Sequence, residues 1–240
     1  TGLTGRVWRV VATDDGKLLV GGDFTIVDGL PNTSGLVALD PITGAVITSW
    51  KADITKVNGS RPLVRAIDVR DGVVYVGGSF NRVTAGNWNT IKTTNAVSLR
   101  ASDANPQGWR PRLSGSAVDI EATSDGRVLV AGWFNRINND TNHGYFGITD
   151  AATGNPVAGI GAWQPSTNNA KYQQAVAQAG DRVMVGGSEH NFQLWDQNRT
   201  QMIDSSITKR GGDTQAIEVF DDTAYWGCHC GDFVYQGTNN

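Results

Sequence analysis

The stretch that decides the fold reads Asp71-Gly72-Val73-Val74-Tyr75-Val76-Gly77-Gly78-Ser79-Phe80. Its pattern of a two-residue turn, a strand-like run and one or two small residues occurs five times, and the first small residue always lies five positions after the turn. The five turns are Asp15-Gly16, Asp71-Gly72, Asp125-Gly126, Gly180-Asp181 and Asp221-Asp222, and the small residues begin at Gly21, Gly77, Ala131, Gly186 and Gly227. An Asp-Gly turn between β-branched runs favours a β-hairpin, because both turn residues can adopt positive φ. The sequence therefore predicts a hairpin that is repeated five times.

Two further strand-like segments follow the hairpin in each full repeat. In the first repeat they are residues 35–40 and 45–50, and the turn Asp40-Pro41-Ile42-Thr43-Gly44 separates them. The third repeat carries the related turn Asp150-Ala151-Ala152-Thr153-Gly154. Four antiparallel strands in a period of about 55 residues fit a propeller blade. We therefore predict an all-β protein: a β-propeller of four-stranded antiparallel blades, with about four complete blades and a partial fifth.

The repeats predict one propeller domain, or a fragment of one, over residues 1–240. They lie near residues 5–57, 61–113, 115–167, 170–211 and 214–236. The fifth repeat has only two predicted strands, and residues 1–3 are too few to supply the two that are missing. An open final blade would leave a bare edge strand. We therefore expect further blades or domains of the same polypeptide, or a neighbouring subunit, to complete the ring.

Composition and charge exclude some classes of partner. The formal net charge is −3 and the sequence pI is about 5.5, whereas nucleic-acid binding needs concentrated basic charge. The arginines are scattered along the sequence, which favours solvated positions. No run of 18 apolar residues occurs, so no membrane span is predicted.

The second repeat resembles a known family pattern. Val64-Arg65-Ala66-Ile67, then Val74 to Phe80, a variable loop and a closing Trp109 are similar to the "delta-sixty" repeat of bacterial secreted β-propellers. The Asp-x-x-Thr-Gly turn belongs to the same pattern and also resembles the turn of quinoprotein-type propeller repeats. The resemblance implies a secreted or cell-surface binding module, often joined to other extracellular domains. It transfers no catalytic residues to this chain.

Recurring aromatic residues are predicted to pack between blades, because the repeat itself requires them. They are Trp50, Trp109 and Trp163 at the repeat ends, and Phe24, Phe80 and Phe134 after the small residues. Four tryptophans break the repeat, namely Trp88, Trp133, Trp195 and Trp226. An exposed Trp88 in the polar stretch 84–89 could stack on a sugar or anchor a protein. The alternative is that Trp88 folds onto the blade edge.

Polar loops supply the other candidate binding residues. One loop, rich in oxygen-bearing side chains, contains Asn138, Asp140 and His143. Its composition is compatible with a calcium site, but the acidic spacing of a calcium loop is absent, so a solvated turn is favoured. Glu189 and His190 stand where other repeats carry Phe, which indicates either a pocket or a shortened loop. We predict no metal site and no cofactor.

Two cysteines flank His229. A disulfide between Cys228 and Cys230 ranks first, free thiols second and a metal site third, because two thiolates alone do not make a zinc site.

The sequence thus predicts a secreted or cell-surface propeller that binds a glycan or a protein through blade loops. One alternative is an enzyme, either carbohydrate-active or quinone-dependent, although no motif supplies a catalytic set. The other is a structural subunit of an extracellular assembly.

Overall fold

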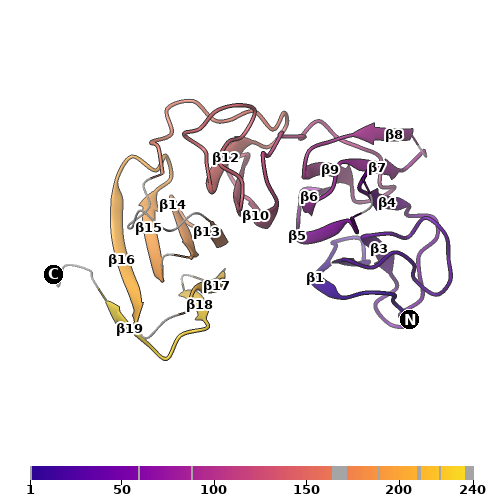
Figure 1. The fold of residues 1–240 in the computed structure, drawn as a ribbon, viewed down its shortest axis with the longest axis horizontal. Coiled ribbons are helices and arrows are strands. Elements are labelled where there is room, and N and C mark those ends of the chain that lie inside the picture. The colour runs from indigo at the N-terminus through magenta and orange to yellow at the C-terminus, as the bar shows by residue number, and fades with distance from the viewer. Residues whose placement is uncertain are drawn as a thin grey trace.

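The computed structural model describes residues 2–58, 60–87, 89–163, 172–188, 190–209, 212–221 and 223–235. Within these residues the regular elements are all β-strands. Successive sheets stand side by side and form an open arc, from the first unit at one end to the fifth at the other (Figure 1). This arrangement confirms the all-β prediction and the sequential order of the units.

We call the sheet formed by each repeat a unit. The first three units share one topology: two strands form a hairpin, of which the first is the inner strand, and a third strand pairs with the second strand of the hairpin. The inner strands of neighbouring units pack against one another along the inside of the arc. The strands are β1 (Val7–Ala12), β2 (Leu18–Gly22) and β3 (Leu36–Leu39), then β5 (Leu63–Arg70), β6 (Val73–Ser79) and β9 (Ala96–Arg100), then β10 (Ala117–Ala122), β11 (Arg127–Gly132) and β12 (Phe146–Asp150).

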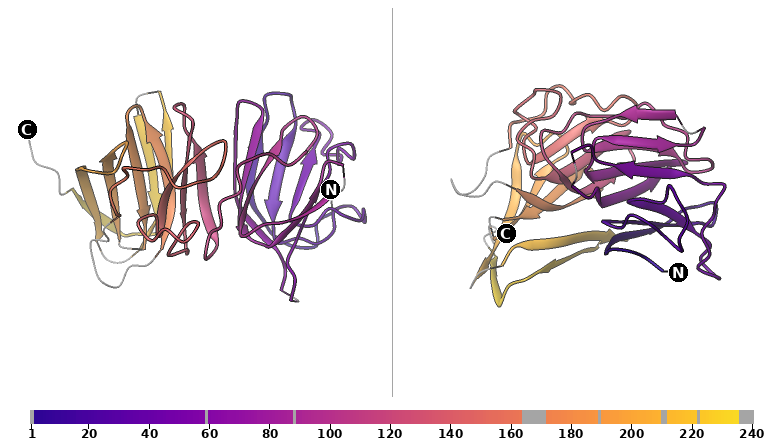
Figure 2. Two further views of the ribbon diagram at one scale, coloured as in Figure 1. Left: turned by 90° about the horizontal axis from the view of Figure 1, so that it is seen from above. Right: turned by 45° about the vertical axis from the view of Figure 1, so that its right-hand side comes forward.

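The last two units differ from the first three. The fourth is a five-stranded sheet of β13 (Gln173–Ala179), β14 (Arg182–Gly187), β15 (Asn191–Asp196), β16 (Met202–Lys209) and β19 (Asp232–Tyr235). The fifth is the hairpin of β17 (Thr214–Phe220) and β18 (Thr223–Cys228). Within the described part of the chain no third strand pairs with β18, since β19 returns to the edge of the fourth unit (Figure 2).

The predicted fourth strand is wrong for the first three units. It is reduced to a single β-bridge in each, between Leu39 and Val46, Leu99 and Pro106, and Thr149 and Pro156. Proline has no amide hydrogen for a ladder, which limits the pairing in the second and third units. In the first unit the chain turns at residues 48–49, directly after the bridge.

An additional small sheet joins the first two repeats. It consists of β4 (Ala52–Thr55), β7 (Arg82–Ala85) and β8 (Asn89–Lys92). The polar stretch 84–89, which the sequence analysis treats as a possible binding loop, therefore overlaps the end of β7 and the start of β8. The equivalent contacts elsewhere are single bridges, from Leu3 to Val27 and from Leu113 to Ile137.

The recurring tryptophans pack against the following repeat, as the sequence predicts. Trp50, Trp109 and Trp163 are all buried. Their indole nitrogens donate hydrogen bonds to the Ala101 carbonyl, the Thr149 hydroxyl and the Gln193 side-chain oxygen, over 2.9, 2.9 and 3.1 Å respectively. Phe24, Phe80 and Phe134 are also buried. Phe80 and Phe134 pack in clusters with Trp50 and Trp109 of the preceding repeats, which confirms the prediction for these two, whereas Phe24 packs in a cluster formed by residues 3–46 alone.

Candidate functional site

The predicted loop around Asn138 uses its polar groups to hold its own shape. Asn138 has φ 49, accepts a hydrogen bond from the Arg112 amide at 2.8 Å and donates one to the Gly154 carbonyl at 3.2 Å. Asp140 accepts a hydrogen bond from the Asn142 amide at 2.8 Å. These contacts give Asn138 and Asp140 structural partners within and beside the loop.

His143 lies inside the loop rather than on its surface. Its Nδ1 accepts a hydrogen bond from the Ile148 amide at 3.2 Å. Burial lowers the pKa of His143 to about 4, and the positive charge of Arg199 adds to the effect. The imidazole is therefore neutral at neutral pH.

Arg199, which sequence reasoning missed, anchors the same loop from the next repeat. This side chain is fully buried. Its guanidinium donates to the carbonyls of Asn142, at 2.7 Å, and Gly161, at 2.8 Å, and lies over the Phe146 ring at 5.1 Å. Burial lowers the pKa of Arg199 to about 9, so it remains charged at neutral pH. Arg199 thus fixes the loop in place against the next repeat.

Two of the predicted binding residues, Trp88 and Glu189, lie outside the described residues. Their neighbour His190 is exposed, has φ 58 and places Nδ1 2.9 Å from the Gly212 carbonyl oxygen. The same nitrogen lies 3.6 Å from a carboxylate oxygen of Asp213. His190 therefore stands beside a carboxylate that approaches from another repeat.

An aromatic pair lies on the other side of Asp213. The rings of Trp133 and Tyr172 are stacked, with centroids 3.8 Å apart and planes inclined by 15°. The Tyr172 hydroxyl donates a hydrogen bond to Asp213 at 2.5 Å, and Gln174 Nε2 donates to the same oxygen at 3.3 Å. Burial and this hydrogen bond raise the pKa of Tyr172 to about 12, so its hydroxyl stays protonated. Trp133 nevertheless remains 52% exposed.

The topology explains why these residues meet. Trp133 follows β11, Tyr172 precedes β13, His190 precedes β15 and Asp213 precedes β17. In antiparallel hairpins the end of one strand and the start of its partner lie at the same edge of the sheet. Three repeats therefore bring these four residues to one edge of the arc. We name this set, together with Gln174, the aromatic cluster.

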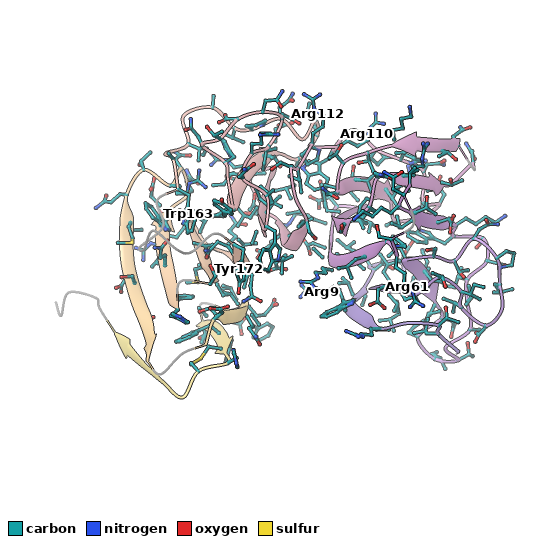
Figure 3. The ribbon with its side chains drawn as sticks, in the orientation of Figure 1. Arg9, Arg61, Arg110, Arg112, Trp163 and Tyr172 are labelled. Carbon is teal, nitrogen blue, oxygen red and sulfur yellow. A yellow bond between two sulfur atoms is a disulfide. The ribbon has the colours of Figure 1, made fainter. Side chains whose placement is uncertain are left out.

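A cavity of about 350 Å³ lies between the inner strands beside the aromatic cluster. Gln174 lines this cavity and also belongs to the aromatic cluster. Figure 3 shows Arg9 projecting from β1 toward the middle of the arc, with Tyr172 across from it. The cavity is lined by residues of all five inner strands, including Trp8, Arg9, Arg65, Asp119, Gln174 and Glu218.

The cavity carries both signs of charge. The Arg65 guanidinium lies 4.8 Å from the centre of the Trp8 ring, in a cation–π contact. Burial raises the pKa of Asp119 to about 6, against the opposing effect of the nearby Arg9 charge. The Nε atoms of Arg9 and Arg65 are buried and have no hydrogen-bond partner among the residues that the structure describes. The arrangement offers guanidinium, carboxyl and amide groups to a polar ligand.

Cations that are scattered in the sequence gather in a second groove. Lys92, Arg110 and Arg112 line a cavity of about 470 Å³ with Thr93, Thr94 and Thr153. Figure 3 places Arg110 and Arg112 together on the outer side of the arc. Arg110 and Arg112 are close in the sequence, whereas the fold brings Lys92 beside them.

The Asp-x-x-Thr-Gly turns have a local structural purpose. Asp40 accepts hydrogen bonds from the Thr43 amide, at 2.7 Å, and from the Thr43 hydroxyl, at 2.9 Å. Asp150 does the same with Thr153, at 2.8 and 2.7 Å. These bonds lower the pKa of both carboxyl groups. Turn formation thus accounts for the Asp-x-x-Thr-Gly motif.

The remaining features concern sulfur and metals. Cys228 and Cys230 are joined in a disulfide at the end of the fifth hairpin. Within residues that the structure describes, no three His, Cys, Asp or Glu side chains form a group that could hold a metal ion. The described part of the chain also contains no helix long and apolar enough to cross a membrane.

Comparisons with known proteins agree with this architecture. The sequence profile of a family described as "Domain of unknown function (DUF5122) beta-propeller" matches residues 13–38 and 123–144. Both segments contain the Asp-Gly turn, the small-residue pair and the following Phe. No curated protein sequence matches the chain.

Two solved structures resemble the chain. The β-propeller domain of Cps50 (Swd1) from Myceliophteria thermophila is 12% identical and has a TM-score of 0.57, over 92% of this chain and 62% of that chain. The computationally designed Ika4 protein is 11% identical, with a TM-score of 0.49 over 78% of this chain and 98% of the Ika4 chain. The family profile and the Cps50 match indicate a β-propeller fold, and the chain spans about 62% of the length of the Cps50 chain. A fold of this class is a rigid scaffold for binding.

Proposed function

We propose that the chain is an extracellular or cell-surface binding propeller that recognises a glycan at the aromatic cluster. The observation that carries the proposal is the exposed Trp133, stacked on Tyr172 beside a carboxylate, an amide and an imidazole. A sugar ring presents an apolar face that packs on an indole, and its hydroxyl groups bond to planar polar side chains. An aromatic surface with a few convergent polar groups is the usual composition of a binding site.

The position of the cluster supports this choice. Trp133 occupies the variable position of the Ala131-Gly132-Trp133-Phe134 motif, directly before the loop 135–143. The loop face predicted from the sequence and the aromatic cluster therefore lie at the same edge of the sheets. The Cys228–Cys230 disulfide supports an extracellular location, because disulfides persist in oxidising compartments.

A glycan array with the 240-residue chain tests the proposal, followed by calorimetry on the best ligand. Trp133→Ala should weaken binding about tenfold or more, since losing an aromatic anchor removes roughly 1.4 kcal/mol or more. Ile42→Ala is the control, because Ile42 is 93% exposed in the turn of the first repeat. Trp88→Ala then tests whether the candidate residue of the second repeat contributes to binding.

Two results would overturn the glycan assignment. One is the absence of binding to any glycan by the folded chain. The other is a glycan that binds equally well to Trp133→Ala. If a pull-down instead recovers a protein whose binding depends on Trp133, the site is a protein-recognition site, which is the alternative that the sequence left open.

A further inference from the structure

A positively charged groove lies where the second unit meets the third. We call it the basic groove, after its lining cations Lys92, Arg110 and Arg112. The turn of the third unit lies directly against the arginine segment, since a Cβ added to Gly154 would lie 2.7 Å from the Pro111 nitrogen and 2.9 Å from the Arg110 nitrogen. The Leu113 amide also donates to the Thr94 carbonyl at 3.2 Å. Backbone contacts on two sides therefore fix the walls of the groove.

The two arginines of the groove lie on one side of the chain. Arg110 and Arg112 are exposed, whereas Pro111 between them is buried. A residue before proline is held in an extended conformation, and alternate residues of an extended segment share a side. The Arg112 amide donates to the Asn138 side-chain oxygen at 2.8 Å, and the Asn138 amide donates to the Arg112 carbonyl at 3.0 Å. The loop around Asn138 thus positions Arg112 in the groove.

The small sheet beside the groove adds uncompensated charge. Arg82 of β7 pairs directly with Lys92 of β8, so both side chains lie on the same face of that sheet. Like charges at directly opposed positions destabilise a sheet. Among the described residues no salt bridge joins Arg82, Lys92 or either groove arginine to a carboxylate, and no described lining residue is acidic. A bound anion would offset this repulsion.

The lining of the groove favours one class of polyanion. Guanidinium groups bind planar oxyanions through paired hydrogen bonds, and the exposed Thr94 can bond a sugar hydroxyl. The cavity of about 470 Å³ has the size of a ligand pocket rather than of a single inorganic anion. Single-stranded nucleic acids stack on aromatic side chains, and membrane-bound surfaces insert large apolar ones. The described lining residues include neither kind.

We propose that the basic groove binds an acidic oligosaccharide, with Lys92, Arg110 and Arg112 contacting its sulfate or carboxylate groups. This is a second site: Figure 3 shows Arg110 and Arg112 on the outer side of the arc and Tyr172 of the aromatic cluster toward its middle. Charge carries this inference, so it does not rest on the glycan assignment of the aromatic cluster. The chain as a whole has a net charge of −3, so binding of a polyanion depends on this local group of cations.

Calorimetry with two acidic oligosaccharides tests the proposal. A heparin octasaccharide supplies sulfate groups, a polygalacturonate octasaccharide supplies carboxylates alone, and a neutral malto-octaose is the ligand control. At least one acidic ligand should bind the 240-residue chain, and its affinity should fall as the salt concentration rises. The double variant Arg110→Gln/Arg112→Gln should weaken binding by about tenfold or more, because two charge-assisted contacts are lost. Arg6→Gln/Arg61→Gln removes the same charge from exposed arginines outside the groove and should bind normally.

A third variant separates binding from folding. Lys92→Gln should weaken binding as well, yet it should not lower the thermal midpoint of the free protein, because it removes the repulsion from Arg82. A lower midpoint would show that Lys92 has a structural role and would count against the proposal.

Several results would overturn the assignment. One is that neither acidic oligosaccharide binds, and another is that the groove variant and its charge control bind equally well. Tighter binding of oligodeoxythymidylate or of phosphatidylserine vesicles through the same arginines would assign the groove to a nucleic acid or a membrane instead. Trp133→Ala should bind the acidic ligand normally. If this variant loses binding while Arg110→Gln/Arg112→Gln retains it, the basic groove is refuted and the aromatic cluster remains the glycan site.

Discussion

At the residue scale, two kinds of tryptophan in the chain have opposite roles. Trp109 recurs with the repeat, is fully buried and donates its indole hydrogen to Thr149 in the following unit. Trp133 breaks the repeat and remains half exposed on Tyr172. Periodicity in the sequence is enough to separate the two, because only positions that serve the blade contact need to recur.

This difference gives a stability prediction. Trp109→Ala should reduce the free energy of unfolding by about 3–5 kcal/mol, through the lost burial and the cavity that remains. Trp133→Ala should change it by less than about 1 kcal/mol, since the side chain is largely at the surface. Chemical denaturation of both variants measures the difference. Equal effects of the two substitutions would contradict the assigned roles.

At the element scale, hydrogen bonds connect neighbouring inner strands. In each case a backbone amide of one inner strand donates to a side-chain carboxylate on the inner strand of the preceding unit. Glu121 on β10 accepts the Gln178 amide of β13, as Asp68 on β5 accepts the Ala122 amide of β10. Burial is the largest influence on Glu121, and it raises the pKa from 4.5 to about 8. The folded protein thus holds a proton that the unfolded chain releases near its ordinary pKa.

The raised pKa of Glu121 predicts a dependence of stability on pH. The contribution of Glu121 to the free energy of unfolding is fully present below pH 4.5 and is lost as the pH rises through about 8. Between these two values the folded state binds a proton that the unfolded state has released. Glu121→Gln should remove this loss. At pH 8 it should stabilise the protein by on the order of 1–3 kcal/mol, since each pKa unit corresponds to at most about 1.4 kcal/mol and solvent access reduces the effect.

Thermal unfolding between about pH 4 and pH 9, a range that spans both pKa values, measures this dependence. Glu218→Gln is a comparison variant: the Glu218 charge is one of the lesser causes of the raised pKa of Glu121, so this substitution should reduce the pH dependence by much less than Glu121→Gln. Parallel pH profiles for the original chain and Glu121→Gln would show that Glu121 does not cause the slope.

At the scale of the whole molecule, the units form an arc whose two ends differ. β18 pairs with β17 alone among the described strands, and β19 instead extends the fourth unit. A two-stranded hairpin is marginal in water, so the fifth unit depends on its packing against β13 and β14. The expectation that the fifth repeat would have an unpaired edge is confirmed for the described residues.

Hydrogen exchange should reveal that edge. At a concentration at which the 240-residue chain is monomeric, the β18 amides that point away from β17 should exchange about tenfold faster or more than those of Val73 to Val76 in β6, which is paired on both sides. Mass spectrometry with peptide-level resolution can measure both segments in one experiment. Equal protection in the monomer would mean that a further strand covers β18.

The sequence by itself determined the repeat, the hairpins and the packing residues, because these follow from local turn chemistry and from residues that recur at fixed spacing. It did not determine the fourth strand, since Pro106 and Pro156 interrupt a ladder whose partner is distant in the chain. The sequence also did not indicate Tyr172 and Asp213 as candidate binding residues. Only the tertiary structure brings these two beside Trp133 and His190, because strand ends from three repeats meet at one edge.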